Sequence, residues 1–358
     1  MDPRQVVERA RWRTDVRGRF EPLAETKRGL RFVLQALTLL VMVGLLAATL
    51  PTDSSARSGR AVVPRLDATP RDRALTGGVV HLRAPASVMI RVPASTFQMG
   101  STQLEVLEAV ADCQRSRRVS GAPAPSAPAF PECRQDAFAI EMPQHWVQLS
   151  SFWLDRTEVT VAAYQHCAKL GRCAPIRYGR GARRFALTEQ PVSLVTWYQA
   201  AAYCAFRHAR LPTEAEFERA ARGTSRRKYP WGNLYNSHAS NHGRLGVSSE
   251  DPSDGYAELA PVGSYPSGST PEGFLDLAGN VSEWVLDNFA LEYPAGRLVD
   301  PRGPAAGSYK TSVRAKVLRG GNYKSIAPGL RGAARGLAEP NTADPRYGFR
   351  CARSASPR

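Results

Sequence analysis

The longest unbroken run of apolar residues lies near the N-terminus. Residues 32–50 (FVLQALTLLVMVGLLAATL) carry no charge over 19 positions, about the length that crosses the hydrocarbon core of a bilayer. Five basic residues lie between positions 16 and 31, whereas three lie between positions 51 and 67. This bias predicts a transmembrane helix at 32–50, with residues 1–31 in the cytoplasm.

A cleaved signal peptide is the alternative interpretation of this run. Its basic region would be 31 residues long, and no Ala-x-Ala cleavage site follows; Ser54-x-Ala56 comes nearest. We therefore expect an uncleaved signal anchor, followed by a polar linker at 51–80 and a folded domain at 81–355. This order predicts a single-pass protein of a bacterial-type inner membrane whose folded domain is periplasmic or otherwise extracytoplasmic.

Beyond residue 81, short apolar runs alternate with segments rich in Gly, Pro, Asn and Ser. Residues 88–99 predict two short strands broken at Pro93, and residues 146–154 alternate like one further strand. After Gly223 almost no helical pattern remains, so the sequence predicts a loop-rich α+β domain. Polar caps and closing glycines predict helices at 160–171 and 213–223, and a further helix fits 196–208.

All six cysteines lie beyond the apolar run, in what would be an oxidising compartment. An even number there predicts disulfides, and no CxxC pair supports a zinc ribbon or a thioredoxin-type site. Residues 103–113 predict a helix, and the Pro- and Ala-rich stretch after it is unsuited to packing. We expect Cys113 and Cys133 to join the base of this segment.

The chain carries 48 Lys and Arg against 32 Asp and Glu, a formal net charge of +16. The basic residues are scattered along the chain rather than collected in one helix or tail. A nucleic-acid-binding protein would show a basic stripe with a groove-entering helix or stacking aromatics, so we expect no nucleic acid partner. The group Arg177, Arg180, Arg183 and Arg184 predicts a solvated loop, with binding of an anion or an acidic partner as the alternative.

Three glutamates, Glu214, Glu216 and Glu218, occupy the third predicted helix. Paired carboxylates can serve as acid and base in glycoside hydrolysis. At the start of a capped helix, however, acids also favour the helix dipole and a solvated face. We expect these three side chains to face solvent rather than to be catalytic.

Seven sequence blocks occur in order between residues 88 and 353. They are VPASTFQMGS (92–101), LDRTEVTVAAY (154–164), RLPTEAEFERAARG (210–223), YPWGN (229–233), DLAGNVSEW (276–284), VLRGGNY (317–323) and YGFRCA (347–352). Together they closely resemble the formylglycine-generating enzyme family, also called the sulfatase-modifying factor domain. The resemblance implies a variant of the C-type-lectin-like fold that is poor in regular structure.

Active members of this family oxidise a cysteine of a sulfatase to formylglycine, using O₂ and a copper ion held by two cysteines. Counted from Arg319 of the Arg-Gly-Gly block, the two cysteine positions are Ser325 and Leu330 in this chain. Neither side chain can be a thiolate ligand, and copper(I) depends on soft sulfur ligands. We therefore expect neither copper binding nor the oxidase chemistry.

The resemblance also implies which cysteines pair. Some relatives have a disulfide between the matching blocks, which here would link Cys204 and Cys351. Cys167 and Cys173 would then pair across a short loop. With Cys113 and Cys133 joined as well, no cysteine would remain for copper.

Two calcium sites are implied by the family. Calcium prefers six to eight oxygen ligands that mix carboxylates with amide and backbone carbonyls. The first site matches the side chains of Asp276 and Glu283 and the carbonyls of Gly279 and Val281, with Asp in place of the more usual Asn. The alternative is a pair of carboxylates that cap turns or pair with nearby Arg.

The second calcium site matches the side chains of Asn241 and Asp254 and the carbonyls of His242 and Tyr256. His238 and His242 also share the H-x₃-H spacing of iron-binding sulfoxide synthases that carry this domain. Arg244 stands where those proteins have Glu, and a positive side chain argues against a metal. We therefore expect solvent-exposed loop histidines rather than an iron site.

The substrate groove of active relatives is walled by the loop that matches residues 322–335. Asn322 replaces the usual Ser, and Ser282 replaces the first Trp of N-x-W-E-W. The sequence predicts a binding or scaffolding module for a protein, a peptide or an envelope polymer. The alternative is a sulfatase-activating or other O₂-dependent oxidoreductase with altered ligands. The expected cleft residues are Ser282, Asn322, Tyr323, Ser325, Leu330 and Arg335.

Overall fold

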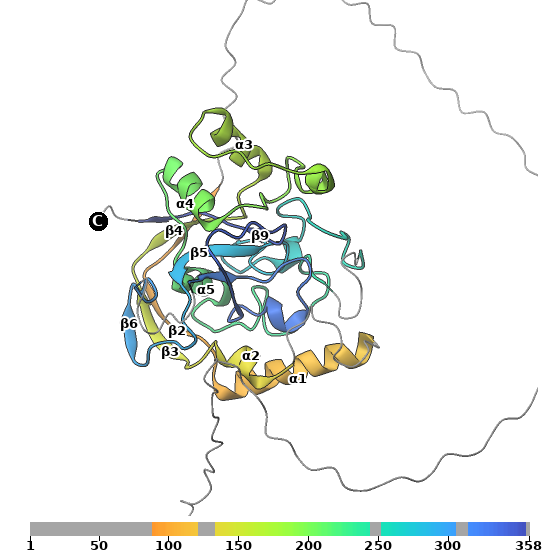
Figure 1. Ribbon diagram of the computed structural model, residues 1–358. Helices are drawn as coiled ribbons and strands as arrows, with labels where there is room; N and C mark the ends of the chain where they lie inside the picture. Colours follow the sequence, from red (N-terminus) through yellow and green to blue (C-terminus); the bar gives the residue numbers. More distant parts are fainter. Residues whose placement is uncertain (1–87, 121–132, 244–251, 306–313, 356–358) are drawn as a thin grey trace, which may run out of the picture. The chain divides into compact units, whose positions relative to one another are not determined.

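A computed structural model describes residues 88–120, 133–243, 252–305 and 314–355, which belong to one folded unit (Figure 1). The predicted cytoplasmic segment 1–31, span 32–50 and linker 51–80 lie outside the described residues, so these expectations stay predictions. Within the described ranges, no helix is both long and apolar enough to cross a membrane.

The strands of the described residues form three small sheets. The first has the order β1-β4-β10 and is antiparallel, and the second, β2-β3-β6, pairs β3 with β6 in parallel. The third has the order β8-β7-β5-β9. The bounds are β1 Met89–Val92, β2 Ser95–Met99, β3 His145–Leu149, β4 Phe152–Asp155, β5 Ser282–Asn288, β6 Arg297–Val299, β7 Lys316–Arg319, β8 Arg335–Ala338, β9 Tyr347–Gly348 and β10 Ala352–Ser354.

The predicted break at Pro93 is confirmed, because β1 ends at Val92 and β2 begins at Ser95. The single strand predicted at 146–154 is wrong, since β3 ends at Leu149 and β4 begins at Phe152 in another sheet. The backbone N–H and the hydroxyl of Ser150 both donate to the Asp300 carboxylate, at 2.7 and 2.8 Å. This side-chain contact replaces the strand ladder at the point where the chain changes sheet.

The three predicted capped helices are confirmed. Thr160, Thr196 and Thr213 each accept a hydrogen bond from the backbone N–H three residues on, and the last two form complete capping boxes. Gly223 ends the third helix at a φ of 65°. The bounds are α3 Val161–Lys169, α4 Trp197–Phe206 and α5 Glu214–Arg222.

The helix predicted at 103–113 extends further, since α1 spans Gln103–Ser120. A short helix, α2 (Gln135–Ala139), packs against it. The remaining helical turns are of the 3₁₀ type, and they are η1 Arg180–Phe185, η2 Pro266–Gly268 and η3 Ala327–Leu330.

Two hydrophobic clusters form most of the core. One packs Phe97 of β2 and Val147 of β3 against Phe217 of α5. The other surrounds Phe349 with residues of α3 and α4 and includes Trp284 of β5, which is fully buried. Burying one such aromatic side chain stabilises the fold by about 1.5–3 kcal/mol. Both clusters reach the third sheet, which therefore holds the loops after β7 in place.

Helix α5 corrects the expectation that its three glutamates face solvent, because all nine of its residues are buried. Glu214 pairs with Arg335 at 2.6 Å, Glu216 with Arg210 at 2.6 Å, and Glu218 with Arg319 at 2.7 Å. At 3.6 residues per turn, Glu216 points to the opposite side of the helix from Glu214 and Glu218. If one side of the helix faced solvent, at least one of the three acids would be exposed there. The helix is instead wrapped by protein, and each acid is matched by an arginine.

All three expected disulfides are present. They are Cys113–Cys133, Cys167–Cys173 and Cys204–Cys351, with Cα–Cα distances of 5.5, 5.4 and 5.5 Å. No cysteine of the chain remains as a free thiol.

Candidate functional site

The loop after β7 brings together three of the residues predicted to line the cleft. The side-chain amide of Asn322 donates to the Ser282 hydroxyl at 2.9 Å, and the backbone N–H of Asn322 donates to the Ser325 hydroxyl at 3.0 Å. Gly321, at a φ of 71°, makes this turn possible. A Cβ on Gly321 would lie 2.6 Å from the carbonyl oxygen of Gly329, so the loop closes tightly on itself around Ser325.

The other three predicted cleft residues lie in the interior. Leu330 is fully buried beside Tyr229 and Ala278. Tyr323 is buried with Phe185, and burial raises the pKa of its hydroxyl to about 12.

The side chain of Arg335 is likewise buried. Its guanidinium donates to both oxygens of Glu214, at 2.6 and 3.0 Å, and lies 4.2 Å from the centre of the Tyr293 ring. The structure therefore supports Ser282, Asn322 and Ser325 as neighbours, with Leu330 and Arg335 beneath the surface.

The segment between β2 and β3 packs onto this loop. Val106 and Ala109 of α1 and Phe138 of α2 form one buried cluster with Ile326, the residue after Ser325. The Cys113–Cys133 disulfide belongs to the same cluster. Helices α1 and α2 thus cover part of the surface next to Ser325 and η3.

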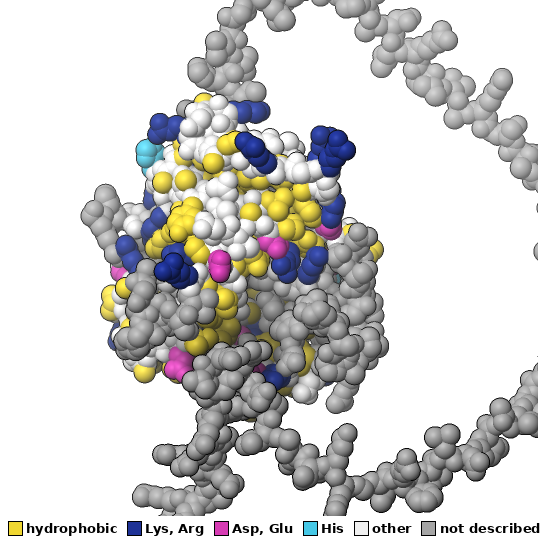
Figure 2. All heavy atoms as spheres, viewed as in Figure 1, with side chains coloured by type: hydrophobic (Ala, Val, Ile, Leu, Met, Phe, Trp, Pro, Cys, Tyr) yellow, Lys and Arg dark blue, Asp and Glu magenta, His cyan; other side chains and the backbone are white. Residues whose placement is uncertain are grey.

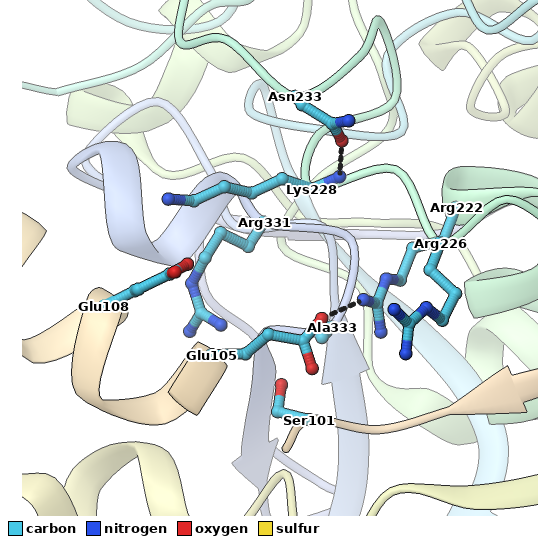
Figure 3. A pocket seen from close by; sticks show the side chains of 9 residues that line it. All are labelled: Ser101, Glu105, Glu108, Arg222, Arg226, Lys228, Asn233, Arg331 and Ala333. Atoms are coloured by element: carbon cyan, nitrogen blue, oxygen red, sulfur yellow. Dashed lines mark hydrogen bonds and ion pairs between the residues drawn. The ribbon is translucent and has the colours of Figure 1, made fainter. Parts of the chain in front are cut away.

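A pocket of about 280 Å³ opens between α1 and the loops that follow α5 and η3 (Figure 3). Arg222 and Arg226 lie on one side of it, whereas Lys228, Arg331 and Glu108 lie on the other. The remaining lining residues are Ser101, Glu105, Asn233 and Ala333.

Most cations of this pocket are already neutralised. Arg222 pairs with Glu105 at 2.8 Å, and Lys228 pairs with Asp112 at 2.7 Å. Arg331 pairs with both oxygens of Glu141, at 2.8 and 2.6 Å. Because these acids come from α1 or from the end of α2, the charge balance of the pocket depends on this covering segment. Of its charged lining residues, only Glu108 and Arg226 lack an ion pair with the described residues, and they lie on opposite sides of the pocket (Figure 3).

The residues of the second predicted calcium site lie together. The carboxylate of Asp254 accepts hydrogen bonds from the backbone N–H groups of His242, at 2.6 Å, and Tyr256, at 3.2 Å. The Asn241 side chain donates to the Glu258 carbonyl and to the Asn280 side chain.

The carbonyl oxygen of the Asn241 side chain, in contrast, is buried and has no hydrogen-bond partner in the described part of the chain. Leaving such an acceptor unsatisfied costs about 1–3 kcal/mol. A bound cation would satisfy it, and an amide oxygen beside a carboxylate is a donor set that calcium accepts. The residues present at this second site therefore fit calcium.

The residues of the first predicted calcium site are less well suited to calcium. Both carboxylate oxygens of Glu283 are bonded to the buried guanidinium of Arg350, at 2.7 to 2.9 Å, and Asp276 accepts a hydrogen bond from the Gly263 N–H at 2.6 Å. Asp276 and Gly279 adopt φ values of 58° and 83°, so the loop is sharply turned. Calcium binding through Glu283 would require Arg350 to give up this pair.

Glu158 is a buried acid that the sequence interpretation missed at this place. One of its oxygens accepts from the Asn280 amide at 3.1 Å, and the other has no partner in the described part. Burial, reinforced by the charge of Asp276, raises the pKa of Glu158 well above its usual value. Both Glu158 and Arg350 lie inside motif blocks (LDRTEVT and GFRCA), and these blocks were the sequence signal that could have pointed to them. No group of three or more His, Cys, Asp or Glu in the described residues is arranged to hold a metal ion.

The two loop histidines differ in environment. His238 is exposed as expected, but His242 is buried, which corrects that part of the expectation. Its ring nitrogens contact the Tyr235 hydroxyl and the carbonyls of Ser237 and Gly243, at 3.0 to 3.2 Å. These contacts occupy the ring, and Arg244 lies outside the described residues.

The arginines at 177, 180, 183 and 184 are exposed as expected, but the last three lie in the 3₁₀ helix η1 rather than in a loop, and Arg184 pairs with Glu258. On the face shown in Figure 2, Lys and Arg side chains are scattered among apolar and acidic ones rather than gathered in one patch.

Comparisons with known proteins place this geometry in a family. The family model described as the sulfatase-modifying factor enzyme 1-like domain matches residues 80–355. The formylglycine-generating enzyme of Streptomyces coelicolor is 39% identical over 46% of this chain and 53% of its own length. The inactive C-alpha-formylglycine-generating enzyme 2 of Mus musculus is 36% identical over 47% of this chain and 50% of its own length.

A further relative is the serine/threonine-protein kinase pkn1 of Chlamydia pneumoniae, 35% identical over 60% of this chain but only 35% of its own length. The chain thus spans about a third to a half of the curated relatives it matches. Among solved structures, PvdO from Pseudomonas aeruginosa superimposes with a TM-score of 0.53 at 24% identity, over 74% of this chain and 94% of PvdO. At that identity the likeness concerns the α+β fold alone. Because the family model covers most of the chain, the chain belongs to the sulfatase-modifying factor enzyme 1-like family, as its sequence blocks predicted.

Proposed function

We propose that this protein is a membrane-anchored, extracytoplasmic binding or scaffolding module that lacks the oxidase activity of the formylglycine-generating enzymes. The observation that carries the proposal is the state of its sulfur atoms. All six cysteines are joined in three disulfides, and the two positions that hold copper in active relatives are Ser325 and Leu330.

The surroundings of these two positions also favour a binding role. The Ser325 hydroxyl accepts a hydrogen bond from the Asn322 N–H, and Leu330 is sealed in an apolar cluster. A hydroxyl and an isobutyl group cannot supply the soft ligands on which copper(I) affinity depends. A mouse relative of similar identity is itself described as inactive. The ligand would be a peptide, a protein or an envelope polymer.

The decisive experiment loads the purified full chain with Cu(I) and incubates it with a cysteine-containing sulfatase-type peptide in the presence of O₂. Mass spectrometry should detect no conversion of the cysteine to formylglycine, and metal analysis should find less than stoichiometric copper after dialysis. The Streptomyces coelicolor enzyme, assayed in parallel, is the positive control. Turnover above the copper-only background would establish the alternative, an oxidoreductase with altered ligands.

Calcium is the cofactor we propose for the second site, through Asn241 and Asp254. The support is twofold: the side-chain oxygen of Asn241 is buried without a partner in the described residues, and the Asp254 carboxylate accepts from the N–H groups of His242 and Tyr256. When bound there, calcium would neutralise charge and hold residues 241 and 242 next to residues 254–256, and no chemical step is assigned to it.

A further inference from the structure

The outer face of the β2-β3-β6 sheet presents an unusual set of side chains. Trp146 of β3 lies at its centre and keeps 51% of its surface exposed. Its cross-strand neighbours are Gln98 of β2 and Arg297 of β6. The next row on this face pairs Thr96, Gln148 and Val299, and Val299 is also exposed. We call these six residues the Trp146 platform.

Two arginines flank the tryptophan, and only neutral side chains hold them. Arg297 donates to the Gln148 side chain at 3.1 Å and to the Thr96 hydroxyl at 3.4 Å. Arg226, from the loop after α5, donates to the side-chain oxygens of Gln98, at 2.9 Å, and Gln144, at 3.0 Å.

Neither arginine pairs with an acid within the described residues, and both are exposed. This contrasts with Arg222, Lys228 and Arg331 of the nearby pocket, each of which has a carboxylate partner. Arg226 also adopts a φ of 59°, a conformation that costs about 1 kcal/mol or more for a residue with a side chain. Two positive charges are therefore fixed in place and left without a counter-charge.

The amide groups of the platform add directed donors. Because the side-chain oxygens of Gln98 and Gln148 accept from Arg226 and Arg297, the NH₂ group of each amide is turned away from its arginine. Those NH₂ groups have no partner in the described part of the chain. Two amide NH₂ groups are thus available as donors near the aromatic ring, one on the neighbouring strand and one two residues along β3.

The side chains of the Trp146 platform, together with Arg226, determine which kind of ligand fits. An aromatic face packs against the C–H groups of a sugar ring, and N–H donors match hydroxyl and carboxylate oxygens. Two unpaired guanidinium groups call for negative charge, and a planar guanidinium suits a carboxylate. Nucleobases of a single strand would require further aromatic rings on which successive bases could stack.

We propose that the Trp146 platform binds an acidic polysaccharide, with a uronic-acid-type ring on Trp146 and its carboxylate paired with Arg297 or Arg226. None of the predicted cleft residues belongs to this surface, so the inference goes beyond the binding role proposed above. Its test is independent of the outcome of the copper and calcium experiments.

The test uses the full chain in detergent or nanodiscs and polygalacturonate as the probe, with affinity measured by calorimetry or biolayer interferometry. Trp146→Ala should weaken binding at least 10-fold, and Trp146→Tyr should restore most of the affinity. Arg297→Gln should weaken binding several-fold, and raised salt should weaken it further. Neutral dextran should bind far more weakly than polygalacturonate.

Trp153→Ala is the matched control, because Trp153 of β4 is also exposed between two cross-strand arginines, Arg91 and Arg353, but has no glutamine as a cross-strand neighbour. It should leave the affinity unchanged, and both Ala variants should unfold within a few degrees of the wild type. The proposal is overturned if polygalacturonate does not bind or if Trp153→Ala weakens binding as much as Trp146→Ala. Equal, Trp146-dependent binding of an oligonucleotide, of anionic phospholipid vesicles or of dextran would overturn it as well.

Discussion

At the scale of single residues, the interior of this protein depends on charge pairs, and Glu218 is the clearest case. It is fully buried, accepts from the Gly100 N–H at 2.7 Å, and pairs with Arg319 and Arg222. Glu218→Gln removes the negative charge and leaves two buried guanidinium groups short of a partner, so we expect a loss of about 3–5 kcal/mol in the free energy of unfolding. Urea unfolding monitored by circular dichroism measures the loss.

Glu108→Gln is the control for this substitution. Glu108 is exposed on α1 and has no ion pair among the described residues. Its substitution should change the free energy of unfolding by less than about 0.5 kcal/mol. Equal urea midpoints for the two variants would contradict the role assigned to Glu218.

Asp287 gives a prediction for pH. Its burial, together with the charge of Glu214, raises the pKa of the Asp287 carboxyl to about 8. In the unfolded chain the pKa is near 4, so the folded state holds the extra proton between these values. The contribution of Asp287 to stability is therefore fully present below pH 4 and is lost as the pH rises towards 8.

Asp287→Asn should remove this dependence while keeping an oxygen for the Glu214 N–H, which donates to Asp287 at 2.8 Å. Relative to the wild type, its free energy of unfolding should rise between pH 5 and 8 by up to about 1.4 kcal/mol per pH unit. Urea titrations at pH 5, 6.5 and 8 give the difference. A constant difference across this range would show that Asp287 is already ionised in the folded protein.

Glu214 and Glu218 of α5 also show where sequence reasoning stops. The acids of α5 were expected in solvent because their arginine partners are remote in the chain: Arg335 lies 121 residues from Glu214, and Arg319 lies 101 residues from Glu218. Helical periodicity describes one helix and its faces, but it contains no information on what covers each face. Burial of a charged residue becomes predictable only with its distant partner.

At the scale of elements, local signals were sufficient for the capped helices, since Thr160, Thr196 and Thr213 each act within one turn. They were insufficient at the change of sheet between β3 and β4, because the contact that ends β3 comes from Asp300, 150 residues away. The same limit applies to the cleft. Motif blocks gave the order of its residues, but packing by distant segments decided that Leu330 and Arg335 lie inside.

The proposed calcium ligands Asn241 and Asp254 give the prediction for metal removal. If calcium holds Asn241 and Asp254 together, dialysis against EDTA should lower the melting temperature by several degrees, and calcium, in excess of EDTA, should restore it. Asn241→Leu should abolish this calcium-dependent shift. Asn233→Ala, an exposed asparagine on a neighbouring loop, should retain it. A melting temperature that does not respond to EDTA in the wild type would exclude a stabilising calcium at this loop.

At the scale of the whole molecule, the family was predictable because seven ordered blocks span nearly the whole domain. The ligand could not be predicted, since the surface that we assign to it consists of two residues from each of three strands together with Arg226 of one loop. Trp146, Arg297 and Arg226 meet only after β3 pairs with β6 and the loop after α5 reaches Gln98. No spacing along the sequence links them.

The membrane anchor belongs to this scale too. We expect the full chain, produced in a bacterial host, to remain in the membrane fraction after carbonate extraction, because 19 uncharged residues at 32–50 are long enough to span a bilayer. Deletion of 32–50 should release the chain from that fraction. As a control for the deletion, removal of residues 55–73, an equally long stretch of the linker, should not release it. Release of the intact chain by carbonate would contradict an uncleaved anchor.

The first and last strands of the folded unit share one partner, since β1 and β10 pair with opposite edges of β4. Met89 aligns with Asp155 and Ser354 with Phe152, so these two residues, near the ends of the described chain, lie within about 15 Å by ordinary strand spacings. A unit with its ends so close can be grafted into a loop of another protein, or have its ends joined by a short Gly/Ser linker, without disturbing its core. The domain is therefore portable, and it can be displayed on a host scaffold where the Trp146 platform is tested away from any membrane.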